Sequence, residues 1–166
     1  MTNRPIINIR ILRGPDVRAL LPMVDCIALM RTTMIAVAEG RAEIPLRSAV
    51  KMPGDIGMMG NMAASSPIPN AMASRSSASA RATSEPPFSS HLGIVLLFKT
   101  AHWRPVAMLD AGEITAIRTA AARSLATDLL ARPDACDLAL LGAGEQAASH
   151  LEAMQCVRPL RRIRVW

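Results

Sequence analysis

Gly142, Gly144 and Ala147 have the spacing of a phosphate-binding turn. A short apolar run, Leu138 to Leu141, precedes them, and a segment with helix-forming residues begins at Glu145. The spacing G-x-G-x-x-A between a strand and a helix lets the chain turn sharply and brings bare backbone amides close to a pyrophosphate. The helix N-terminus adds a partial positive charge there. The pattern predicts a dinucleotide site, and the alternative is a strand-to-helix turn that binds nothing.

A dinucleotide-binding sheet needs more than this turn. Its next strand ends in an acidic residue that holds the ribose hydroxyl groups. Here the next strand is expected at Arg162 to Trp166, where the sequence stops. We therefore predict the first strand, the turn, one crossover helix and part of a second strand of a Rossmann-type sheet, as the N-terminal portion of a longer protein. NAD and NADP both remain open as cofactors.

The elements before this turn predict an α+β arrangement. Asp16 is expected to cap a helix, and Gly40 to end the next one. From Ala64 onward Ser and Ala dominate the sequence, which is typical of a disordered linker. The expected strands are Ile6 to Leu12, Ile44 to Val50, and a hairpin of Ile94 to Phe98 with Arg104 to Leu109; the expected helices are Asp16 to Val24, Asp25 to Ala38 and Asp110 to Ala131.

The composition of the 166 residues excludes several classes of protein. The net charge is +6, but aromatic residues make up only 2%, so stacking platforms for single-stranded nucleic acid are scarce and we expect no nucleic-acid partner. Cys26, Cys136 and Cys156 show no C-x-x-C pair, which predicts neither zinc nor disulfides but small buried residues of a cytoplasmic protein. Neither a signal peptide nor a membrane-spanning segment is recognisable.

Two stretches, DAGEITAIRTAAARSLAT and LARPDACDLALLGAGEQAASHLEAM, together resemble the ornithine cyclodeaminase and mu-crystallin family. PLRSAV, the MPG near Met52 and SSHLGIVLLF resemble it too. The resemblance implies an α/β fold with an N-terminal α+β substrate and dimerisation domain, followed by the start of a Rossmann-type NAD(P)-binding domain. We place the first in residues 1–110 and the second, with its connecting helix, in residues 111–166. The resemblance also implies a homodimer when the protein is full length.

The same resemblance implies the site. Arg47 and Arg118 match the arginines that bind the substrate carboxylate, for which a two-pronged donor is suited. The implied substrate is a small amino acid or imino acid, and the implied activity is cyclodeamination, or imine or ketimine reduction, by hydride transfer with NAD or NADP. The alternative is a non-catalytic NADP(H)-binding protein of the mu-crystallin type, and no metal is implied. The positions that match residues along the dinucleotide are Ser90, Thr119, Gly142, Ala143, Gly144 and Gln146.

One family feature is missing. The family places a catalytic lysine between the MPG motif and S-S-H, but Lys51 and Lys99 both lie outside that interval. The Ser/Ala-rich residues 63–88 occupy its place, and we expect them to be disordered and the chain to be an inactive fragment. As a hypothesis, Ala64 to Glu85 is translated one nucleotide out of frame. The shifted frame would encode a lysine across the codons of Ser74 and Arg75.

Overall fold

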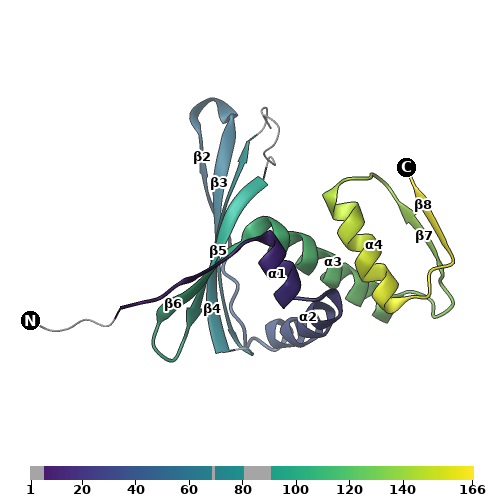
Figure 1. The fold of residues 1–166 in the computed structure, drawn as a ribbon, viewed down its shortest axis with the longest axis horizontal. Helices are drawn as coiled ribbons and strands as arrows, with labels where there is room; N and C mark the ends of the chain where they lie inside the picture. The colour runs from purple at the N-terminus through teal and green to yellow at the C-terminus, as the bar shows by residue number, and fades with distance from the viewer. Residues whose placement is uncertain (1–5, 69, 81–90) are drawn as a thin grey trace, which may run out of the picture.

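The computed structural model describes residues 6–68, 70–80 and 91–166. Most of these residues form one large sheet with helices on a single side, and a small sheet lies at the other end of the molecule (Figure 1). The large sheet has six strands in the order β1-β6-β5-β4-β3-β2. These are β1 (Arg10–Leu12), β2 (Ser48–Lys51), β3 (Gly57–Pro67), β4 (Asn70–Ala80), β5 (His91–Lys99) and β6 (Arg104–Asp110). A 3-10 turn, η1 (Pro53–Asp55), separates β2 from β3.

The pairing follows the chain from β2 to β6. Each of these strands runs antiparallel to the next, including the hairpin of β5 and β6 that the sequence predicts. β1 departs from this pattern because it joins the far edge parallel to β6, with Leu12 opposite Leu109. β1 is also shorter than expected, since only its last three residues pair.

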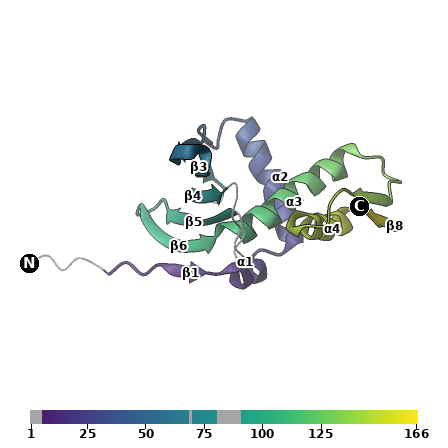
Figure 2. The same cartoon turned by 90° about the horizontal axis from the view of Figure 1, so that it is seen from above.

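Three helices cover one face of this sheet: α1 (Gly14–Leu20), α2 (Met23–Ala38) and α3 (Ala111–Leu130). Figures 1 and 2 both place α2 and α3 on the same side of the sheet. The core lies where α1, α2 and α3 pack together, and Val17, Cys26 and Ile117, one from each helix, are almost fully buried there. Asp16 does not cap α1 as predicted; it lies in the first turn, and its carboxylate accepts a hydrogen bond from the amide of Arg13. Gly40 follows α2 in a left-handed conformation, as a helix-ending glycine does.

The small sheet is a βαβ unit. β7 (Asp137–Leu140) and β8 (Arg162–Val165) pair in parallel, and α4 (Glu145–Val157) connects them. α4 packs against α3, where Ala120 and Ala121 of α3 and Ala153 of α4 are buried in the same core cluster. The alanines of α3 therefore serve close helix packing. The fold class predicted from the sequence, with an α+β part followed by the start of a Rossmann-type unit, is confirmed by this architecture.

The disorder expected for residues 63–88 is wrong for those that the structure describes. Residues 63–67 belong to β3 and residues 70–80 form β4, which lies inside the sheet between β3 and β5. The reason is that both ladders of hydrogen bonds come from neighbouring strands, so pairing overrides the weak preference of Ser and Ala for strands. Their small side chains fill the space poorly. A hollow of about 160 Å³ lies between α2 and these strands, lined by Val37, Ala64 and Ala73 among others.

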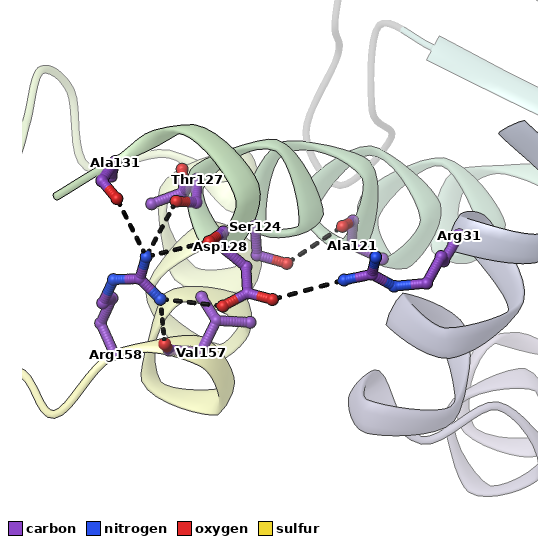
Figure 3. Close-up of polar contacts among 8 residues, drawn as sticks. All are labelled: Arg31, Ala121, Ser124, Thr127, Asp128, Ala131, Val157 and Arg158. Carbon is purple, nitrogen blue, oxygen red and sulfur yellow. Dashed lines mark hydrogen bonds and ion pairs between the residues drawn. The ribbon is translucent and has the colours of Figure 1, made fainter. Parts of the chain in front are cut away.

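The junction of the helices depends on one arginine (Figure 3). Arg158 follows α4, and its guanidinium donates to the carbonyl oxygens of Thr127, Asp128 and Ala131 at the end of α3. It also pairs with the Asp128 carboxylate at 2.9 Å. Arg31 of α2 lies 3.5 Å from the same carboxylate. Arg158 therefore satisfies the last carbonyl groups of α3 and ties the βαβ unit to the helices of the large sheet.

The three cysteines differ in their exposure. Only Cys26 is buried; Cys136 is half-buried and Cys156 is exposed, so the prediction of three buried thiols is wrong for two of them. Burial raises the pKa of the Cys26 thiol.

In the described part of the chain, no single helix has the length and apolar composition to cross a membrane, although α1 and α2, bent by 74°, pass that test as a pair.

Candidate functional site

The glycine turn lies between β7 and α4, as the sequence predicts. Gly142 has φ of 99°, a conformation that residues with side chains rarely adopt. Its amide donates to the Trp166 carbonyl at 2.7 Å, so this amide is used within the sheet. Gly144 is the N-cap residue of α4, and no side chain of the described residues caps the helix. The first-turn amides of Glu145 and Gln146 therefore have no side-chain acceptor and remain available to an anion.

A hollow of about 430 Å³ adjoins this turn. It is lined by the predicted residues Gly142, Gly144 and Gln146, and also by Arg123 of α3 and His150 of α4. The sequence did not predict Arg123 or His150 as site residues. Arg123 is exposed and brings a cation to the hollow. His150 is 8% exposed; its Nδ1 donates to the carbonyl oxygen of Gln146 at 2.5 Å, and its Nε2 has no partner among the described residues.

The two predicted substrate arginines come from different elements. Arg47 directly precedes β2, and Arg118 lies in the second turn of α3; both side chains are exposed. The structure adds a third arginine that the sequence reading did not assign to the site. Arg75 lies in the middle of β4, where it is opposite Met62 of β3 and Val95 of β5. The Ser/Ala-rich composition around Arg75 does not indicate a site, and the out-of-frame hypothesis pointed to a lysine at this position but not to the arginine itself. The strand register assigns Arg75 to the site.

The register places Arg75 on the helix-covered face of the sheet. Residues directly opposite each other in antiparallel strands point to the same face. Arg75 is opposite Val95, and Val95 is opposite Leu109, which packs against the helical core. The same alignment continues from β3 to β2. The first pair of that ladder is Ser48 of β2 with Asn61 of β3. One residue further, Arg47 is therefore aligned with Met62. Arg47 and Arg75 therefore lie in one row, two strands or about 10 Å apart.

The electrostatics agree with this placement. Burial lowers the pKa of Arg75, and the nearby guanidinium groups of Arg118 and Arg47 lower it further. The Nε of Arg75 is buried and has no hydrogen-bond partner among the described residues. Within that same part of the chain, Arg47, Arg75 and Arg118 form no ion pair. The three arginines form a group that we call the arginine cluster.

α3 links the arginine cluster to the glycine turn. Arg118 belongs to the cluster, and Arg123, about 7.5 Å further along the helix axis, lines the hollow at the turn. Between them, the Oγ1 of Thr119 is buried without a partner among the described residues. Ala143 lies within the turn, whereas Ser90, the remaining predicted cofactor residue, falls outside the described residues. In the described ranges, no group of three or more His, Cys, Asp or Glu residues could hold a metal ion.

Comparisons with known proteins agree with the resemblance seen in the sequence. The model of the ornithine cyclodeaminase/mu-crystallin family matches residues 9–166. The ketimine reductase mu-crystallin of Mus musculus is 34% identical over 128 residues, which are 77% of this chain and 41% of that protein. The L-lysine cyclodeaminase of Streptomyces rapamycinicus is 53% identical over 58 residues, 35% of this chain and 17% of that protein.

A solved structure shows the same architecture. The Thermococcus litoralis Δ1-pyrroline-2-carboxylate reductase, in complex with NADH and L-proline, superposes with a TM-score of 0.87 at 27% identity. The match covers 95% of this chain and 49% of that one. The chain therefore spans half or less of the length of these relatives.

Proposed function

Because the chain belongs to the ornithine cyclodeaminase/mu-crystallin family, we propose that it is part of an NAD(P)-dependent cyclodeaminase or imine reductase that acts on a small amino acid or imino acid. The observation that carries this proposal is the glycine turn at the uncapped N-terminus of α4, next to a hollow and connected to the arginine cluster by α3. NAD and NADP are both compatible with it.

In this proposal the two parts of the chain bind different molecules. Residues 111–166 bind the dinucleotide, with the amides at Gly144 and beyond facing the phosphates and Arg123 adding positive charge. Residues 1–110 and Arg118 hold the substrate, since Arg47 and Arg118 bind its carboxylate as two-pronged donors. When bound, the nicotinamide supplies hydride transfer to or from the α-carbon of the substrate. The protein's own part is to orient both molecules.

A non-catalytic NADP(H)-binding protein of the mu-crystallin type is the second candidate. One observation favours it. The two lysines of the chain, Lys51 and Lys99, lie in β2 and β5, whereas the residue of β4 that faces Arg47 and Arg118 is Arg75. A guanidinium holds its proton too firmly for general acid or base work near neutral pH. Turnover of an imino acid with NADH or NADPH by a full-length protein with the reading frame of Ala64 to Glu85 restored separates the two candidates, because the second predicts binding without turnover.

The glycine turn can be tested with a variant that separates folding from binding. In Gly144→Asp, the new carboxylate occupies an N-cap position, where Asp is preferred, so the free energy of unfolding should rise by a few tenths of a kcal/mol. The same charge repels phosphate, so we expect at least tenfold weaker binding of NADH and NADPH in fluorescence titrations. The control is Gly40→Ala, a strained substitution far from the turn, which should lower stability and leave binding unchanged. Unchanged binding by Gly144→Asp would refute the proposed site.

The homodimer belongs to the same proposal. The face of the large sheet opposite the helices carries a row of exposed apolar side chains, in which Val50, Met59 and Leu92 are aligned through Ala78. Open apolar patches of this kind are typical of protein interfaces. A second copy of the chain is the proposed occupant, and light scattering on the full-length protein should give twice the mass of one chain. The cytoplasmic location expected from the sequence stays a prediction.

A further inference from the structure

The arginine cluster carries more positive charge than one carboxylate can balance. Arg47, directly before β2, lies in the same row as Arg75 of β4, and the guanidinium groups of Arg47 and Arg118 both act on that of Arg75. Within the described residues none of the three has an acidic partner. Like charges held together at a partly buried site are unfavourable unless an anion compensates them. The buried, unpartnered Nε of Arg75 is one donor that such an anion would satisfy.

The number and kind of cations define the anion. Guanidinium groups present planar pairs of N–H donors that match carboxylates in a two-pronged manner, and they stay charged near neutral pH. A monocarboxylate that engages Arg47 and Arg118 leaves Arg75 uncompensated. A second carboxylate on the same small molecule would reach Arg75. The backbone of Arg75 lies about 10 Å from that of Arg47 in the same row, and the two long side chains shorten the distance between their guanidinium groups. A diamino acid would instead bring a side-chain ammonium toward three cations.

We propose that the arginine cluster selects small dicarboxylates, such as the amino or imino derivatives of a four-carbon dicarboxylic acid, and rejects diamino acids. In this site Arg47 and Arg118 hold one carboxylate, and Arg75 holds the other. This inference rests on the proposed function only in taking the cluster as the substrate site. Arg75 acts as a specificity-determining residue and not as a proton donor.

Titration calorimetry of the chain with three simple probes tests the selection without a cofactor. Succinate should bind at least tenfold more tightly than propionate, and ornithine should show no measurable binding. Equal affinity for succinate and propionate, or binding of ornithine, would overturn the proposal. This series needs no variant, so the outcome does not depend on the folding of a mutant.

Substitution of Arg75 assigns the selectivity to that residue. Arg75→Gln should weaken succinate binding tenfold to a hundredfold and leave propionate nearly unchanged, whereas Arg75→Lys, which keeps the charge but loses the two-pronged geometry, should retain part of the preference. The matched control is Arg132→Gln, which removes an exposed arginine paired with Asp134, far from the cluster, and should change neither affinity. An unchanged succinate preference in Arg75→Gln would refute the assignment.

The two proposals can fail separately. Succinate binding that depends on Arg75, without any binding of NADH or NADPH, would sustain the arginine cluster and reject the proposed enzyme. Dinucleotide binding that depends on Gly144, with no preference between succinate and propionate, would sustain the proposed function and reject the dicarboxylate site.

Discussion

The two sheets of this molecule are stabilised in different ways. The six-stranded sheet has helices on one face, and Leu12 of β1 and Leu109 of β6 pack against the buried core of those helices. In the two-stranded sheet every residue of β8 is exposed, and Leu141, directly after β7, is 91% exposed. The arginine cluster therefore lies on a supported sheet, whereas the glycine turn lies on a unit that depends on the packing of α4 against α3. The order of the turn should thus be more sensitive to changes at that junction than the order of the cluster.

The largest expected effect comes from the junction itself. In Arg158→Ala, three carbonyl oxygens at the end of α3 and the Asp128 carboxylate lose a donor whose side chain is only 10% exposed. We expect the free energy of unfolding to fall by about 2–3 kcal/mol, measured by urea denaturation. Hydrogen exchange should show faster opening of β7, α4 and β8 than of β3 to β6.

Arg161→Ala is the control for this change. Arg161 pairs with Asp137 at 3.2 Å, but its side chain is 71% exposed, so the loss should stay below about 0.5 kcal/mol. Equal effects of the two substitutions, or uniform opening of both sheets in Arg158→Ala, would contradict the difference drawn between the sheets.

A second change addresses the large sheet alone. A methyl group at Gly93 of β5 would lie 2.8 Å from the Cα of Ser77 in β4, so Gly93→Ala forces the two strands apart. We expect a loss of about 1–3 kcal/mol, with the arginine cluster disturbed and the glycine turn unaffected. In Gly60→Ala, on β3, the nearest atom is 4.0 Å from the new methyl group, and stability should stay equal or rise slightly. Similar losses in both variants would show that close strand approach is not the cause.

The smallest expected effect is a gain. Ala73 of β4 lines the hollow under α2, so Ala73→Val adds apolar volume there and a side chain that favours strands. We expect thermal or urea unfolding to show a gain of about 0.5–1 kcal/mol. Ala78→Val adds the same side chain to the exposed, opposite face of β4 and should give less. A gain at position 78 equal to that at position 73 would show that strand preference, and not filling of the hollow, is responsible.

The hypothesis that Ala64 to Glu85 is read out of frame stays a prediction, and the coding DNA tests it. The structure gives it a specific consequence. Ser74 and Arg75, across whose codons the shifted lysine would lie, are in the middle of β4, and Arg75 faces Arg47 and Arg118. A shifted frame would therefore place a lysine at or beside the arginine cluster.

Local features were predictable from the sequence because their causes are local. The turn at Gly142 requires a positive φ, and the helix that begins at Glu145 follows from residues within a few positions of it. The same holds for α3, which begins after Asp110, whose carboxylate accepts from the amide of Glu113. The resemblance of these motifs to a known family also predicted that Arg47 and Arg118 bind the substrate.

The role of Arg75 was decided only by tertiary structure. Its own neighbours are Ser and Ala, whose composition indicated a linker, but hydrogen bonds from β3 and β5 hold the segment as a strand. The register of those strands then determines which side chains face the helices, since a shift by one residue would turn Arg75 to the opposite face. A sequence pattern can specify a turn or a helix start, but a site assembled from three separate elements exists only once their pairing is fixed.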